Sequence, residues 1–249
     1  MESYIRFWAL RPCLVIILAI MAVDVSPSAA IHPNLAKKEL EKRGVQISGE
    51  ALLAAVEGDD KEVAGLLLDV GVDVNSTGSL ENAVGKGNGA MALFLLKRGA
   101  NPNRSGMLAG IAEKGDVELA RMFLEHGADP NRGKPLAKAA RGGHLEIARM
   151  LLARGAEKNH GHPILGAVEN GHADMVRLLL MNGANPNQGR PLLLAVGNGD
   201  VEIVRLLLEY GAHPKTHTDE YHQGGALGVA KKKGYAEIVS ILQAAGAEE

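Results

Sequence analysis

The stretch His162–Asn187, HPILGAVENGHADMVRLLLMNGANPN, decides the fold because it contains one complete structural repeat. Its first part, His162 to Asn170, predicts a short helix that ends at the turn residue Gly171. The second part, Asp174 to Met181, predicts a longer helix with one apolar side. Gly183 closes it in the left-handed conformation that glycine adopts at little steric cost. Neither helix is long enough to be stable alone in water, so each pair must bury its apolar face against the next.

The same pattern recurs along most of the chain at a fixed period. Leucine-rich segments end at a glycine that is followed by a small residue, at Gly71, Gly99, Gly127, Gly155, Gly183, Gly211 and Gly246. The first five intervals between these glycines are 28 residues each and the last is 35. A fixed period of roughly 20–50 residues is typical of a solenoid, which has an extended binding surface rather than one deep active site.

Two further copies carry a family resemblance. They are PLAKAARGGHLEIARMLLARGAEKN, from Pro135, and PLLLAVGNGDVEIVRLLLEYGAHP, from Pro191. Both share a Pro-Leu start, a turn glycine and a Leu-Leu ending before Gly-Ala. This pattern resembles the ankyrin repeat over roughly residues 48 to 249. The resemblance implies an all-α, ankyrin-like solenoid of about seven helix-turn-helix repeats.

The chain departs from the family pattern in two ways. The interior repeats have 28 residues, whereas the usual repeat has about 33 and begins Thr-Pro-Leu-His. The missing residues fall where the family builds a β-hairpin finger, so truncated finger loops are expected. The Thr and His of the starting tetrapeptide are also absent, so the hydrogen bonds that they make in the family cannot form here.

The N-terminal segment differs in kind from the repeats. Two arginines precede the apolar run Leu14–Val23, and small residues follow at Ser28 and Ala30. This arrangement predicts a secretory signal peptide over residues 1–30, cleaved after Ala30. The alternative is a membrane anchor, which needs about 20 apolar residues and therefore a longer run. The mature protein is expected to be periplasmic or secreted and not attached to a membrane.

The mature chain is predicted to form one elongated domain. Residues 31–47 contain a polar amphipathic helix and are expected to cap the N-terminal end, because terminal repeats need a polar outer face. Residues 48–249 form the solenoid, whose last repeat has a longer finger at 215–225. Cys13, the only cysteine, lies in the segment to be removed. This excludes disulfides and thiolate sites in the mature chain and suits an oxidising compartment.

Little in the sequence indicates catalysis or a cofactor. The glycine-rich stretch Gly85–Ala90 lacks the preceding strand and the Lys-Ser/Thr ending of a phosphate-binding loop. His160 and His162 flank one glycine, but zinc needs three or four converging ligands, so surface histidines are favoured over a metal site. A net charge of −2 at pH 7 does not indicate nucleic-acid binding. We expect no enzyme activity, no cofactor and no nucleic-acid partner.

Acidic and basic residues recur at i, i+3 on the predicted second helices. These pairs are Glu118–Arg121, Glu146–Arg149, Asp174–Arg177 and Glu202–Arg205. Such pairs stabilise a helix by about 0.2–0.5 kcal/mol each and indicate a solvated outer face.

By the family resemblance, the first helices and the finger turns form a concave side that binds protein partners. Side chains just before each turn glycine vary between repeats, as expected of a binding surface, although any exposed position also varies. The finger turns carry basic residues, which Lys215 and His217 continue, and predict a positive rim that attracts an acidic partner. Ordinary solubility is the alternative. Tyr221 is a predicted anchor, unless it packs over the last repeat. The predicted contact residues are Arg104, Arg132, Lys134, Arg141, His160, His162, Glu169, Arg190, Asn198 and Tyr221.

These features predict an exported, non-catalytic protein-binding module that is monomeric when unbound. The dense repeats and the signal resemble bacterial ankyrin proteins of the periplasm, which implies an inhibitor or immunity protein that clamps a periplasmic enzyme. Three alternatives stay open. The protein would instead support such an enzyme as an accessory factor, join two envelope proteins as a scaffold, or act on a host as a secreted effector.

Overall fold

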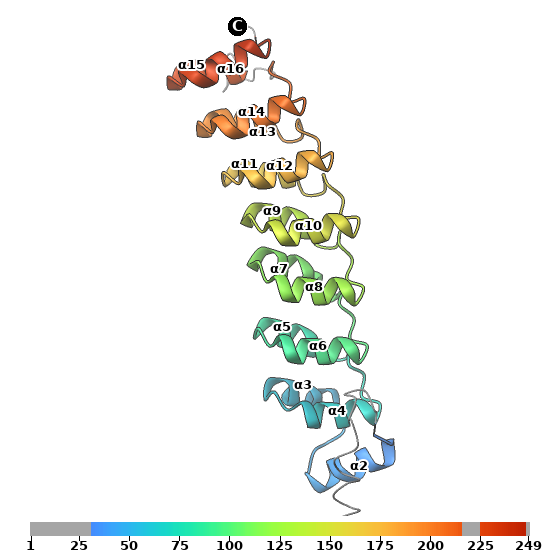
Figure 1. Ribbon diagram of the computed structural model, residues 1–249. Helices are drawn as coiled ribbons and strands as arrows, with labels where there is room; N and C mark the ends of the chain where they lie inside the picture. Colours follow the sequence, from blue (N-terminus) through green and yellow to red (C-terminus); the bar gives the residue numbers. More distant parts are fainter. Residues whose placement is uncertain (1–30, 216–224, 248–249) are drawn as a thin grey trace, which may run out of the picture.

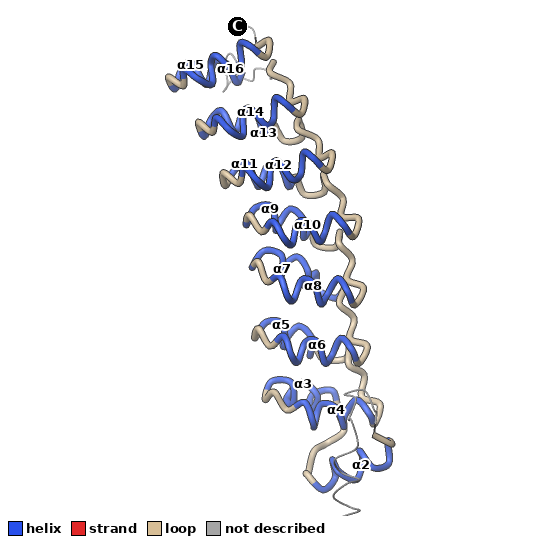
Figure 2. The backbone as a smooth tube through the Cα atoms, viewed as in Figure 1, coloured by secondary structure: helices blue, strands red, loops and turns tan. Residues whose placement is uncertain are grey.

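The computed structural model describes residues 31–215 and 225–247, and the regular structure there is helical, with no strand in these ranges (Figures 1 and 2). After α2 (Pro33–Lys42) come seven helix pairs. They are α3 (Gly49–Glu57) with α4 (Lys61–Asp69), α5 (Ser79–Gly85) with α6 (Gly89–Lys97), α7 (Met107–Lys114) with α8 (Val117–Glu125), α9 (Pro135–Gly142) with α10 (Leu145–Ala153), α11 (Pro163–Glu169) with α12 (Ala173–Met181), α13 (Pro191–Asn198) with α14 (Val201–Glu209), and α15 (Gly225–Lys233) with α16 (Ala236–Ala244). The predicted all-α solenoid of about seven repeats is confirmed. The predicted signal peptide, His217 and Tyr221 lie outside the described residues.

The helix pairs stack in one column in the order of the sequence (Figure 1). Helices α7, α9, α11, α13 and α15 pack on one another as one row, and α6, α8, α10, α12, α14 and α16 form the other. Helix α2 lies at the N-terminal end and packs against α4. The connections between pairs run along one edge of the column, and the turns within pairs lie at the opposite edge (Figure 2).

Several helices begin at a residue whose side chain caps the first turn. The carboxylates of Asp116 and Asp200 each accept a hydrogen bond, 3.0 Å long, from the backbone N–H three residues further on. Ser48 caps α3 in the same way at 3.1 Å. Each cap satisfies one of the backbone donors that a helix start leaves unpaired. The caps therefore define where these short helices begin.

Two repeats place a histidine where others have a capping residue. His144 Nε2 lies 3.2 Å from the backbone oxygen of Glu113, and His172 Nε2 lies 3.1 Å from that of Arg141. Each contact joins a histidine to the end of the first helix in the preceding repeat. Both histidines therefore belong to the scaffold.

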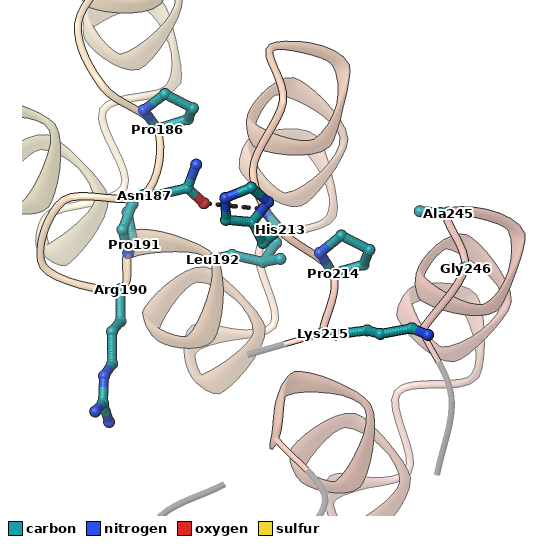
Figure 3. A pocket seen from close by; sticks show the side chains of 10 residues that line it. All are labelled: Pro186, Asn187, Arg190, Pro191, Leu192, His213, Pro214, Lys215, Ala245 and Gly246. Carbon is teal, nitrogen blue, oxygen red and sulfur yellow. Dashed lines mark hydrogen bonds between the residues drawn. The ribbon is translucent and has the colours of Figure 1, made fainter. Parts of the chain in front are cut away.

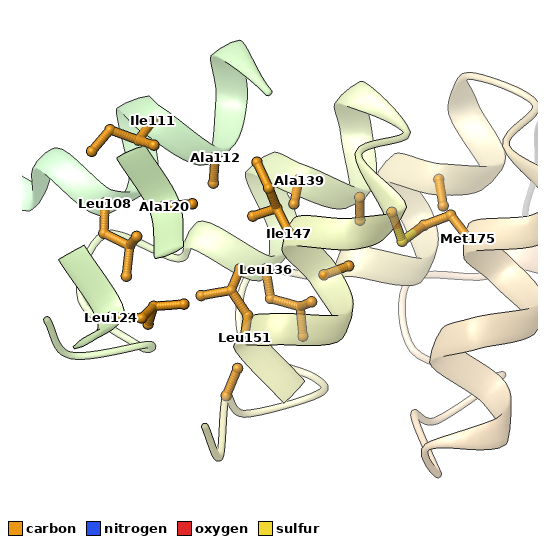
Figure 4. Packing of buried hydrophobic residues seen from close by; sticks show 14 of the residues in the cluster. Leu108, Ile111, Ala112, Ala120, Leu124, Leu136, Ala139, Ile147, Leu151 and Met175 are labelled. Carbon is orange, nitrogen blue, oxygen red and sulfur yellow. The ribbon is translucent and has the colours of Figure 1, made fainter. Parts of the chain in front are cut away.

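The core is a continuous apolar layer between the two rows of helices (Figure 4). Ile147 and Leu151 of α10 are fully buried, and Leu136 of α9 is nearly so. Small residues such as Ala139 and Ala112 lie between them and are also fully buried. Because alanine fills little volume, adjacent repeats approach closely, and aliphatic side chains of modest size fill each layer.

A ladder of asparagines links successive finger turns. In each rung the side-chain oxygen of one asparagine accepts a hydrogen bond from a backbone N–H of the next turn, over 2.6–2.9 Å. The asparagines are Asn75, Asn103, Asn131, Asn159 and Asn187. The ladder supplies contacts between repeats in a chain that lacks the family's Thr and His.

The prediction of ion pairs within single second helices is wrong. Arg121 pairs with Glu146 of the next second helix at 2.8 Å, and Arg205 pairs with Glu237 at 2.9 Å. Arg177 likewise pairs with Glu202, at 3.3 Å. Packed helices lie about 8–10 Å apart, so a long arginine side chain reaches the neighbouring helix. These pairs join repeats instead of stabilising single helices.

Candidate functional site

The finger turns of three consecutive repeats hold a basic residue in a left-handed backbone conformation. Lys134, His162 and Arg190 have φ of 62°, 57° and 59°. The corresponding position is glycine in two earlier repeats, Gly78 and Gly106. For a residue with a side chain this conformation costs roughly 1–2 kcal/mol. The three basic side chains are therefore presented at a cost in backbone energy that glycine would avoid.

These basic residues sit at the end of a short turn and immediately before a helix. The backbone N–H of Lys134 donates to Asn131 O at 3.2 Å, and that of His162 donates to Asn159 O at 3.3 Å. A proline follows each of them, and residues before proline favour extended backbone. The truncated finger forces the chain to reverse within a few residues, which accounts for the unusual conformation.

A pocket of about 170 Å³ opens between the first helices α9 and α11. Its lining combines basic side chains with small residues: Lys134, Ala137, Lys138, Arg141, Gly161, His162, Leu165, Gly166 and Glu169. Four of the ten predicted contact residues meet here, although they come from two repeats. The structure thus brings part of the predicted rim and part of the predicted first-helix surface into one site.

Two glycines make room for the pocket. A Cβ atom on Gly161 would stand 2.9 Å from Lys134 Cδ and 3.0 Å from Ala137 Cβ. A Cβ on Gly166 would stand 3.4 Å from Arg141 Cβ. The Lys134 side chain therefore lies directly over the next finger turn, where any larger residue would displace it.

The charges in the pocket are only partly balanced. Lys138 Nζ pairs with Glu113 at 3.0 Å, and Arg141 Nη2 lies 3.6 Å from a Glu169 oxygen. Within the described parts of the chain, the side chains of Lys134 and His162 have no hydrogen-bonding or ionic partner. Both are exposed. Lys134 therefore adds a positive charge to the pocket that no described residue neutralises.

The other predicted contact residues lie outside this pocket. Arg104 donates to the backbone oxygen of Asn75 and lies 3.7 Å from Glu81, which holds it to the preceding repeat. Asn198 Nδ2 donates to Val168 O at 3.2 Å and so links two repeats. Arg132 and His160 are exposed at the tips of their turns. Tyr221 lies outside the described residues.

A second pocket, of about 540 Å³, lies at the last two repeats (Figure 3). Three prolines, Pro186, Pro191 and Pro214, contribute to its lining. The Arg190 side chain extends away from Pro186 and Pro214, and His213 is held through its backbone N–H by Asn187 at 2.8 Å (Figure 3). Lys215 on this pocket leads into residues 216–224, which lie outside the described range.

Sequence reasoning missed one charged residue of the first pocket. Lys138 lies on α9, at a position that holds Asn82, Gly110, Gly166 or Leu194 in other repeats. A single charged residue at a position that is otherwise uncharged was a usable signal. It was missed because only the residues just before each turn glycine were considered as first-helix contacts.

Across residues 31–215 and 225–247, no group of three His, Cys, Asp or Glu side chains could hold a metal ion. No helix in the same ranges is long and apolar enough to cross a membrane.

Stacked helix pairs joined by short turns define a helical-repeat solenoid with an open side for binding. A family model for ankyrin repeats in three copies matches residues 107–162 and 164–248. The chain belongs to the ankyrin repeat family, whose members are typically non-catalytic modules for protein binding. The same helix pairing continues through α3–α6, ahead of the matched residues. A comparison with curated proteins found no match.

Proposed function

We propose that this protein is an exported, non-catalytic inhibitor or immunity protein that binds an enzyme of the periplasm. Its family supplies protein-binding modules. The arginine-containing start and the apolar run Leu14–Val23 favour export. Residues 31–249 contain no cysteine, which suits an oxidising compartment.

The observation that carries the proposal is the pocket between α9 and α11. Lys134 presents a positive charge there and His162 an imidazole ring, and neither side chain has a partner in the described parts of the chain. The protein as a whole is slightly acidic, with a net charge of −2. A local positive site on such a protein attracts an acidic patch on a partner and raises the association rate. An inhibitor that must capture an enzyme quickly benefits from this attraction.

The test is capture followed by an activity assay. The protein, purified after expression of the full chain, is immobilised and exposed to periplasmic extract at low and at moderate salt. We expect one enzyme to be retained in stoichiometric amount at low salt, released at moderate salt, and less active when bound. A rise in its activity would overturn inhibition in favour of an accessory role.

Matched variants show whether capture uses the pocket. The double substitution Lys134→Glu/His162→Glu reverses the charge there and is expected to abolish retention. Lys97→Glu changes the charge of an exposed residue on α6 and is expected to retain the enzyme. Equal retention by both variants, or no retained enzyme at all, would contradict the proposal.

A further inference from the structure

The backbone conformation at Lys134 and His162 costs the fold stability. Both residues occupy the left-handed region, at φ 62° and 57°, and neither side chain caps the helix that follows. Gly78 and Gly106 adopt the same conformation in other repeats without steric cost. Residues held in such conformations are concentrated at functional sites. The basic side chain is therefore what distinguishes these two positions from Gly78 and Gly106.

The two side chains line one pocket, and the guanidinium of Arg141 lies beside them. Arg141 approaches Glu169 only to 3.6 Å, and the side chains are 65% and 43% exposed. That separation exceeds a normal hydrogen bond, and exposed pairs of this kind contribute little free energy. Arg141 can therefore turn to another carboxylate at small cost. Lys138 is already paired with Glu113 at 3.0 Å, so it lines the pocket without taking part in binding.

We propose that the pocket between α9 and α11 binds one aspartate or glutamate side chain of a partner protein, held by Lys134, His162 and Arg141. The proposal rests on the proposed function in one respect: the carboxylate belongs to a captured protein. A volume of about 170 Å³ accommodates a carboxyl group with a short stem. Glu169 adds a negative charge to the wall, which disfavours a dianion such as phosphate and favours a singly charged carboxylate.

The test uses a tetra-glutamate peptide, blocked at both ends, and a tetra-glutamine peptide as its neutral counterpart. Each is titrated into the ¹⁵N-labelled protein, purified after expression of the full chain, and amide shifts are followed by NMR. We expect the glutamate peptide to give saturable shifts at Lys134, Gly161, His162 and Gly166, with a dissociation constant on the order of millimolar. Equal shifts with the glutamine peptide, or equal shifts at basic residues throughout the chain, would overturn the proposal.

Substitutions separate binding from folding. Lys134→Gly/His162→Gly removes both basic side chains and relieves the backbone, so we expect at least tenfold weaker peptide binding and no drop in the unfolding midpoint. Glu169→Gln removes the competing carboxylate and should tighten binding by about threefold. As controls, Ser105→Gly relieves a left-handed residue in another finger turn, and Lys97→Gln removes a distant charge. Both should bind the peptide like the unmodified protein, and weakening as large as in the double variant would overturn the proposal.

The peptide experiment and the capture experiment fail independently. If an enzyme is captured but peptide binding survives in Lys134→Gly/His162→Gly, the pocket proposal is wrong and the proposed function stands. If the peptide binds as expected and no enzyme is captured, the pocket proposal stands and the proposed function fails.

Discussion

The side-chain oxygen of Asn131 accepts a hydrogen bond from the backbone N–H of Glu157 at 2.7 Å, which ties one finger turn to the next. Four other asparagines make the equivalent contact along the column. In a solenoid, stability is approximately the sum of the repeats and of the interfaces between neighbours. Each rung therefore contributes to one specific interface.

Asn131→Ala should lower the free energy of unfolding by about 1 kcal/mol, because the N–H of Glu157 loses its acceptor. Chemical denaturation measures the change. Asn131→Asp keeps an acceptor oxygen at the same place and should lose less than half as much. Equal losses in the two variants would show that the hydrogen bond is not the cause.

His162→Gly alone should raise the free energy of unfolding by up to about 1 kcal/mol, because glycine adopts positive φ without a Cβ penalty. The adjacent substitution Gly161→Ala should destabilise the protein. Gly161 has a φ of 79°, and a Cβ on it would stand 2.9 Å from Lys134 Cδ. Denaturant titrations of both variants test the opposite signs, and loss of stability in His162→Gly would refute the strain argument.

The ion pairs between successive second helices are interrupted at one interface, where a substitution can restore a pair. Arg149 on α10 faces the position of Asp174, whereas the paired arginines face glutamates, and no ion pair forms for Arg149 in the described ranges. Asp174→Glu adds one methylene and should stabilise the protein by about 0.2–0.5 kcal/mol, seen as a higher thermal midpoint. The gain should vanish in the Arg149→Ala background, and its persistence there would rule out this pair as the source.

The N-terminal end should weaken in acid. Arg43 donates to Glu39 at 2.9 Å and to Glu62 at 2.5 Å, and so ties the end of α2 to α4. The hydrogen bond from Arg43, with the charge of Lys42, lowers the pKa of Glu39 from 4.5. A lowered carboxyl pKa stabilises the fold above the unfolded pKa, and this is lost as pH falls through the folded value. The hydrogen-exchange protection factors in α2, which correct for slower intrinsic exchange in acid, should therefore fall below about pH 4.5. Glu39→Gln should show a flatter profile, and identical profiles would contradict this assignment.

Charge reversal at the finger turns should affect binding through long-range attraction. Arg132→Glu/Arg190→Glu should weaken binding of a captured partner and flatten its dependence on salt, because fewer charges remain to be screened. Titrations at several salt concentrations measure both effects, with Lys97→Glu as the control. Unchanged affinity in the double variant would discard the positive rim.

The sequence was sufficient to predict the fold because each repeat contains the residues that begin, end and bury its two helices. Glycines spaced 28 residues apart, a capping residue such as Ser48 and apolar side chains such as Met175 and Leu179 specify two helices and the face that each buries. A repeat contacts only its neighbours, so local pattern and nearest-neighbour packing together define the solenoid. Lys138 was harder to recognise from this regular pattern, because its place in the pocket depends on the residues of the neighbouring repeat.

The sequence by itself determined the helix pairs, their number and the shortened fingers, because these follow from periodic burial and turn residues within one repeat. Only the tertiary structure decided which polar groups meet. Arg121 joins Glu146, 25 residues away, in preference to its own helix, and the turns place Lys134 and His162 beside Arg141 in one pocket. The physical reason is that the stacking distance and the left-handed turns set these neighbours, and both arise only when the repeats assemble.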